Sequence, residues 1–124
     1  MAYLVKLNTH KNLKGDLTVI EKNIPFEIKR VYYIYNVDHS IRGKHRHKKT
    51  IQAAVCICGS CTISCQSAPD QDFKHYKLSN PEKLLIINPE DYHTMSKFSE
   101  NAILLVLASE FYDDKDALIK IDMS

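Results

Sequence analysis

Two histidines separated by one residue are the strongest chemical signal in the chain. His45 and His47 lie in the stretch Arg42-Gly43-Lys44-His45-Arg46-His47. In an extended strand alternate side chains share a face, so both imidazoles point the same way, roughly 7 Å apart along the strand. Imidazole binds transition metals and also exchanges protons near neutral pH. The pair therefore indicates either a metal site or a proton-transfer site.

The elements that must position this pair read as strands. Short β-branched and aromatic segments, separated by turn signals about every ten residues, predict an all-β sandwich or barrel. The best strand spans 30–37, and the apolar run 102–108 has the length of a buried strand. The acidic tail has room for one helical turn at 113–118.

Size and charge limit the function classes. The 124 residues suit one domain, 1–124, with a single core. The formal net charge is +2, and the densest basic patch, 44–49, is interrupted by the histidines, so no nucleic acid polymer is expected as a partner. No apolar run approaches the ~20 residues of a membrane span, and the first residues lack signal-peptide features. We expect a cytoplasmic protein that does not enter the membrane.

Four cysteines crowd into ten residues: Cys56, Cys58, Cys61 and Cys65. Their spacing matches no familiar zinc site, and we expect reduced thiols that pack as small apolar residues. A metal or redox role stays open as the alternative. Gly59-Ser60 between two of them predicts a two-residue hairpin turn.

A wider pattern surrounds the histidine pair and resembles the two motifs of the cupins, small jelly-roll β-barrels. The residues that carry it are His45, His47, Gln52, Gly59, Pro89 and His93. The resemblance implies an all-β, cupin-like jelly-roll fold. It also implies that the second-motif histidine approaches the pair.

Gln52 departs from this pattern, because it stands where a metal-binding cupin has a carboxylate ligand. A neutral amide is a poorer partner for a divalent transition metal. Lys48 and Lys49 add positive charge that opposes a cation. We therefore expect no metal and no cofactor, and the pair is interpreted as a proton relay.

Three longer motifs are similar to the sugar-nucleotide 3,4-ketoisomerases. They are Arg30-Val31-Tyr32-Tyr33-Ile34-Tyr35-Asn36-Val37, Arg42-Gly43-x-His45-x-His47-Lys48, and the run from Ser99 to Ser109 that continues through Phe111-Tyr112-Asp113. The resemblance implies a metal-independent homodimer. Its substrate would be dTDP-4-keto-6-deoxy-D-glucose, whose ketone moves from C4 to C3 for deoxyamino sugars of bacterial surface glycans.

The resemblance also implies roles for single residues. It assigns His47 as the base at C3, with His45 and Tyr33 completing a relay that returns a proton to C4. A guanidinium matches phosphate oxygens, so Arg42 is predicted to hold the diphosphate. Tyr33 in the barrel core and Arg42 in a loop ion pair are the structural alternatives.

Three further residues are predicted to bind substrate: Gln52, His93 and Lys14. A cation at Lys14 together with His93 slightly favours the galacto-configured product. Competing hypotheses are a dTDP-sugar 3,5-epimerase, a metal-dependent cupin oxygenase and a cupin that binds a ligand without catalysis.

Overall fold

Every regular element in the computed structural model, which describes residues 1–119, is a β-strand. The strands are β1 (Tyr3–Lys6), β2 (Asn8–Asn12), β3 (Gly15–Val19), β4 (Arg30–Tyr35), β5 (Arg42–His47), β6 (Gln52–Cys58), β7 (Cys61–Gln66), β8 (Lys74–Leu78), β9 (Lys83–Ile87), β10 (Tyr92–Ser96), β11 (Ile103–Ala108) and β12 (Ala117–Ile119). The all-β expectation is confirmed.

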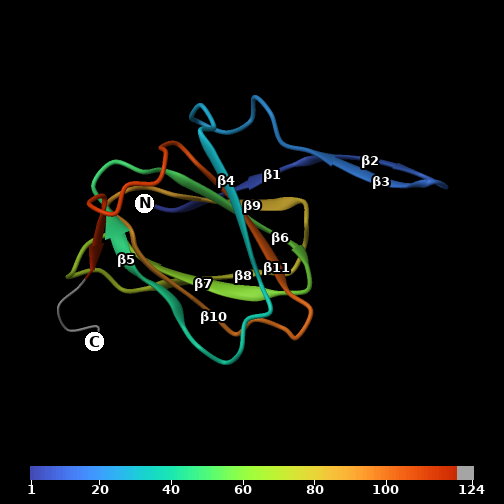
Figure 1. The fold of residues 1–124 in the computed structure, drawn as a ribbon. Helices are drawn as coiled ribbons and strands as arrows, with labels where there is room; N and C mark the ends of the chain where they lie inside the picture. The colour runs from blue at the N-terminus through green and yellow to red at the C-terminus, as the bar shows by residue number, and fades with distance from the viewer. Residues whose placement is uncertain (120–124) are drawn as a thin grey trace.

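The strands form two five-stranded antiparallel sheets that face each other (Figure 1). One sheet has the order β1-β9-β6-β11-β4 and the other the order β12-β5-β10-β7-β8. Consecutive strands repeatedly fall in different sheets or in non-adjacent positions, as in a jelly roll. The fold therefore agrees with the cupin-like prediction.

Apolar side chains from both sheets fill the space between them. Leu85, Leu104 and Val106 come from one sheet and Ile63 and Met95 from the other, and all five are buried.

The turn between β6 and β7 is confirmed, but the hairpin predicted from it is wrong. β6 pairs with β9 and β11, whereas β7 pairs with β8 and β10, so the chain crosses between sheets at Gly59-Ser60. Gly59 has a φ of +68°, and a Cβ there would lie 2.9 Å from the Cα of Ala102 and closer still to Ser99. Only glycine fits this turn without strain.

Three of the four cysteines pack in the core as predicted, and Cys58 is partly exposed. Cys56, Cys61 and Cys65 are buried in the core, and none of the four cysteines forms a disulfide in the part of the chain described. Cys56 donates a hydrogen bond to the carbonyl oxygen of Cys58. Cys56, Cys61 and Cys65 therefore contribute to the apolar core.

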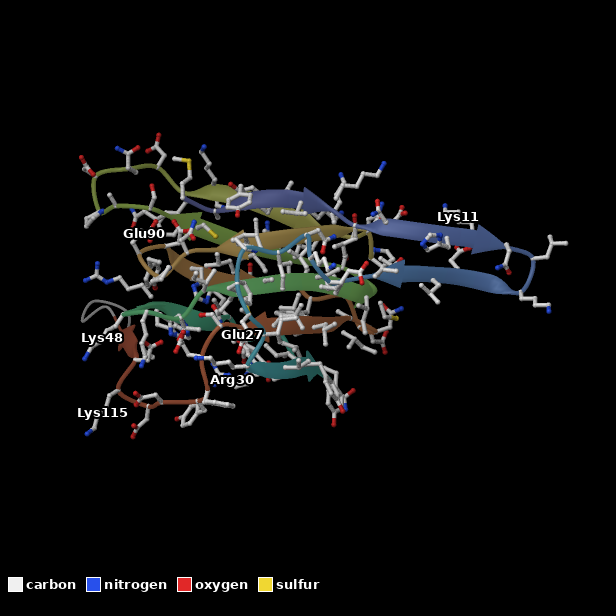
Figure 2. All side chains as sticks on the ribbon, turned by 90° about the horizontal axis from the view of Figure 1, so that it is seen from above. Lys11, Glu27, Arg30, Lys48, Glu90 and Lys115 are labelled. Carbon is white, nitrogen blue, oxygen red and sulfur yellow. The ribbon has the colours of Figure 1, made fainter. Side chains whose placement is uncertain are left out.

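Strands β2 and β3 form a two-stranded hairpin that projects away from the sandwich (Figure 1). Figure 2 shows Lys11 on this hairpin, with Lys48 and Lys115 at the opposite end of the molecule. Lys14 lies in the exposed turn between the two strands. In one chain Lys14 is therefore far from the histidine pair.

The described residues contain no helix that is long and apolar enough to cross a membrane.

Candidate active site

Three histidines meet where strands β5 and β10 pair. His93 of β10 lies opposite His45 of β5 in the register. Gly43 permits this close pairing, because it has a φ of +85° and a Cβ there would lie 3.0 Å from the carbonyl oxygen of His93. His45 and His47 share a face of β5, as the alternation predicts.

The three imidazole rings are in contact distance of one another. Ring centroids are 4.8 Å apart for His45 and His47, 4.9 Å for His45 and His93, and 6.0 Å for His47 and His93. One ring nitrogen from each residue lies within 4.8 Å of the other two. Among residues 1–119, these three side chains form a group that could hold a metal ion.

His47 is held by a carboxylate that comes from the far end of the chain. Its Nδ1 lies 2.9 Å from Oδ2 of Asp116, which has only 5% of its side chain exposed. Asp116 also accepts hydrogen bonds from the Thr50 hydroxyl and from the backbone N–H of Lys49. With Nδ1–H donated to Asp116, the Nε2 lone pair of His47 is free to accept a proton.

All three histidines are neutral at pH 7. Burial lowers the pKa of His47, and Asp116 offsets only part of that effect. Burial and the neighbouring His47 lower the pKa of His45. Burial, with its two neighbouring imidazoles, lowers the pKa of His93 to about 3. A neutral imidazole is the form required of a general base.

Asp116 carries the negative charge of this group. Burial raises the pKa of Asp116, but hydrogen bonds from Thr50, Lys49 and His47 outweigh burial and place the net pKa below its usual range. The carboxylate is therefore ionised at pH 7 and stabilises the imidazolium that forms when His47 takes a proton.

A cavity of about 490 Å³ opens onto the histidine pair, a size that suits a small organic ligand. Its lining comprises Arg30, Tyr32, His45, His47, Thr50, Gln52, Tyr112, Asp113, Asp114, Asp116 and Ala117. These residues come from β4, β5 and β6, from the loop between β5 and β6, and from the segment that leads into β12 together with the first residue of that strand. The cavity therefore gathers parts of the chain that are distant in sequence.

Gln52 holds the Tyr32 hydroxyl in place at the cavity wall. Its Nε2 donates a hydrogen bond of 2.7 Å to the hydroxyl oxygen of Tyr32. A carboxylate could not make this donation, which gives a physical reason for an amide at position 52. Since the tyrosine oxygen accepts this bond, its own O–H remains available to donate to a ligand.

Tyr33, predicted as a catalytic residue, does not lie in this cavity. Inward and outward side chains alternate along β4, and Tyr33 faces out with 61% of its surface exposed. Tyr32 takes the inward position, with the Arg30 guanidinium 5.3 Å from its ring centroid. Within one chain it is therefore Tyr32 that faces the cavity, because neighbouring residues of a strand point to opposite faces, and the catalytic role of Tyr33 stays a prediction.

The remaining predicted residues divide into two groups. Gln52 and His93 lie with the histidine pair. Arg42 is exposed at the start of β5 and does not line the cavity, but its charge acts on Tyr32. Burial raises the pKa of Tyr32, and the charges of Arg30 and Arg42 partly oppose that rise. Lys14 is not brought near the site within one chain.

Three residues that the structure adds to the site were not predicted. Tyr32 and Arg30 could have been found, because both share a face of the strand that the sequence predicts. No sequence signal pointed to Asp116, which stands among other acidic residues in a segment expected to be helical. The segment instead forms a turn and then β12, which pairs with β5 so that Ala117 lies opposite His47.

The fold and the site together define a cupin-like jelly roll whose cavity is lined by His45, His47 and Tyr32. A family model described as FdtA, WxcM-like, C-terminal matches residues 2–123, and the chain belongs to this family. It is 39% identical over 112 residues to the TDP-4-oxo-6-deoxy-alpha-D-glucose-3,4-oxoisomerase of Aneurinibacillus thermoaerophilus, covering 88% of this chain and 79% of that protein.

Solved structures give the same result. A variant of the 3,4-ketoisomerase QdtA from Thermoanaerobacterium thermosaccharolyticum, in complex with TDP-4-keto-6-deoxyglucose, has a TM-score of 0.92 and 41% identity, covering 98% of this chain and 88% of that one. The WlaRB TDP-quinovose 3,4-ketoisomerase from Campylobacter jejuni has a TM-score of 0.91 and 35% identity, covering 98% and 94%. The similarity therefore extends over nearly the whole chain.

Proposed function

We propose that this chain is a sugar-nucleotide 3,4-ketoisomerase that converts dTDP-4-keto-6-deoxy-D-glucose into a dTDP-3-keto-6-deoxyhexose. The observation that carries the proposal is one cavity lined by two neutral imidazoles and by the Tyr32 side chain. Membership of a family with 3,4-ketoisomerase relatives supports it. The product would serve the synthesis of deoxyamino sugars for bacterial surface glycans.

The first step requires a base beside C3. His47 Nε2 takes the C3 proton, and the electron pair of that C–H bond forms the C3–C4 double bond of an enediol. The C4 carbonyl oxygen gains charge in this step and accepts a proton from the Tyr32 hydroxyl. Asp116 stabilises the imidazolium through the hydrogen bond at Nδ1.

The second step reverses the first at the neighbouring carbon. The Tyr32 phenolate takes back a proton from the C3 hydroxyl, whose O–H electron pair forms the C3 carbonyl. The electron pair of the C3–C4 double bond takes up at C4 the proton that His47 holds, passed on through the neighbouring His45. C4 is reduced and C3 is oxidised within one molecule, so the balance needs no external oxidant, reductant or cofactor. Proton carriers are sufficient for this reaction.

We propose that positively charged side chains outside the histidine group bind the diphosphate of the substrate. Arg42, predicted from the motif, and Arg30, which lines the cavity, are the guanidinium groups near Tyr32. Both can neutralise the diphosphate. His93 and Lys14 are proposed to set the configuration at C4 in favour of the galacto product.

The test is turnover in D2O followed by NMR of the sugar. We expect the ketone to move from C4 to C3 and deuterium to appear at the carbons that exchange. A 3,5-epimerase would instead exchange C3 and C5 and leave the ketone at C4. Binding of the sugar nucleotide without migration or exchange would identify a non-catalytic cupin and overturn the proposal.

The enzyme is proposed to act as a homodimer. An apolar hollow of about 410 Å³ lies on the outer face of the sheet, lined by Tyr33, Tyr35, Ile57, Ile103 and Leu105. The projecting hairpin exposes Leu13 and Leu17. Apolar surfaces of this kind favour association.

Light scattering tests the dimer. We expect a mass twice the 14.3 kDa of one chain. Tyr35→Asp places a charge in the apolar hollow and should shift the mass toward the monomer, whereas Lys11→Asp on the exposed hairpin surface should not. A monomeric mass for the unmodified protein at micromolar concentration would contradict the dimer.

The compartment is proposed to be the cytoplasm. The four free cysteines suit a reducing environment, because such thiols persist where disulfides do not form.

A further inference from the structure

Thr50 carries a buried hydroxyl whose partner is the carboxylate that contacts His47. It lies in the loop between β5 and β6, and only 2% of its surface is exposed. Its Oγ1 donates a hydrogen bond to Oδ2 of Asp116, the same oxygen that lies 2.9 Å from Nδ1 of His47. One carboxylate oxygen therefore connects the Thr50 hydroxyl to the proposed base.

The Asp116 carboxylate needs donors to fix its plane. The torsion that turns an aspartate carboxylate about its Cβ–Cγ bond is broad, so the side chain itself does not set the plane. The backbone N–H of Lys49 holds Oδ1 at 3.0 Å, and the Thr50 hydroxyl holds Oδ2. A single donor would leave the carboxylate free to turn about that hydrogen bond, whereas donors at both oxygens fix it.

Thr50 and His47 share the acceptor sites of one oxygen. Each oxygen of an ionised carboxylate offers two lone pairs. With the Thr50 hydroxyl on one lone pair of Oδ2, the other is directed to Nδ1–H of His47. The hydrogen bond at one ring nitrogen decides which tautomer an imidazole adopts. The shared oxygen therefore keeps the lone pair of His47 on Nε2.

The loop that carries Thr50 is itself fixed to the segment that carries Asp116. The backbone N–H of Lys48 donates to the carbonyl oxygen of Asp116 at 2.9 Å. The N–H of Ile51 donates to Oγ of Ser109, and the N–H of Ser109 donates to the carbonyl oxygen of Ile51. Threonine is β-branched, which restricts its χ1 torsion. A fixed backbone and a stiff side chain therefore present the hydroxyl.

We propose that Thr50 is a positioning residue, whose hydroxyl fixes the Asp116 carboxylate and thereby holds His47 in the orientation and tautomer needed for proton transfer. Thr50 acts through Asp116 and not on the substrate, because its hydroxyl proton is used on the carboxylate. Its effect on the rate rests on the proposed function. The state of His47, in contrast, can be measured without any substrate.

The first test is NMR of the ligand-free protein labelled with ¹⁵N in its histidines. We expect a slowly exchanging proton on Nδ1 of His47, assigned by its absence in His47→Asn. Thr50→Val removes the hydroxyl at nearly constant shape and should lose this signal, whereas Thr50→Ser should retain it. Circular dichroism checks that each variant is folded. An unchanged signal in Thr50→Val would overturn the positioning role.

The second test is a double-mutant cycle of Thr50 with Asp116. Thr50→Val should lower kcat by ~10-fold, the lower end of what loss of an outer partner costs, and Thr50→Ser should recover most of the rate. KM should change by less than about twofold, since no contact with the substrate is removed.

The cycle distinguishes an effect through Asp116 from a direct one. In the Asp116→Asn background, Thr50→Val should cost less than about twofold, because no carboxylate is left to position. Equal losses in both backgrounds would mean that Thr50 acts independently of Asp116 and would contradict the proposal. Thr62→Val on β7 is the matched control and should retain nearly full activity.

The two tests also separate the role of Thr50 from the proposed function. If the Nδ1 proton follows the expected pattern but the unmodified protein does not move the ketone, Thr50 positions His47 and the proposed function fails. If the ketone moves and Thr50→Val behaves like the unmodified protein in both tests, the function stands and the positioning role fails.

Discussion

Replacing His47 with asparagine is expected to lower kcat by on the order of 10³-fold, within the range of general acid–base catalysis. Asparagine retains a side-chain N–H that can donate to Asp116, so the carboxylate keeps a partner and the local fold is preserved. It has no lone pair of suitable basicity to accept the C3 proton. The measurement is the rate of ketone migration and of deuterium incorporation in D2O by NMR.

Asp116→Asn is the companion variant that tests why His47 is effective. It removes the charge that stabilises the imidazolium and allows the wrong tautomer, so kcat should fall at least ~10-fold. Because Asp116 raises the pKa of His47, its loss should also move the acidic limb of the pH–rate profile to lower pH. A purely structural role for Asp116 would not shift this limb.

The control for both variants lies outside the cavity. His75 is exposed on β8, where its Nδ1 contacts the Ser64 hydroxyl. His75→Asn should retain nearly full activity. If His47→Asn keeps more than about a tenth of the activity while remaining folded, the base at C3 is a different residue, and His45 is the first candidate.

The positions of the strands could be predicted from the sequence more reliably than which side chains of each strand point inward. The pattern over 30–37 predicts a strand, and the structure places β4 at Arg30–Tyr35. Both faces of this strand carry tyrosine, so composition alone cannot decide which tyrosine points inward. Which tyrosine faces inward depends on the pairing of β4 with β11, in which Tyr32 lies opposite Val106 and Tyr33 lies opposite Leu105.

Contacts that depend on strand register across distant segments could not be predicted. His47 and Asp116 are 69 residues apart, and the pairing of β12 with β5 brings them together. In contrast, the His45 and His47 pair needs only the two-residue period of one strand. The turn at Gly59-Ser60 is a second example. Its residue types predict a turn, but they do not show that the strands before and after it join different sheets.

The adjacent tyrosines of β4 give the second prediction with a large expected effect. Tyr32→Phe should lower kcat by about 10²-fold, because it removes the donor to the oxygen where negative charge develops. Tyr33→Phe should change kcat by less than about twofold, since its hydroxyl lies on the exposed outer face and the ring is retained.

In Tyr32→Phe, a lower stability of the fold must be distinguished from a lower kcat of the folded protein. Without the tyrosine oxygen, the buried Gln52 amide loses its acceptor, which costs about 1–3 kcal/mol. Thermal unfolding measures this cost, and the double variant Tyr32→Phe/Gln52→Leu removes both partners and should recover stability without recovering kcat.

The opposite result would contradict the role of Tyr32. If Tyr33→Phe were inactive and Tyr32→Phe active, the outward-facing Tyr33 would have to act in the cavity of a second chain. The site would then be shared across the dimer. The pair of single variants therefore decides whether the relay is completed within one chain, as the Gln52–Tyr32 hydrogen bond indicates, or between two.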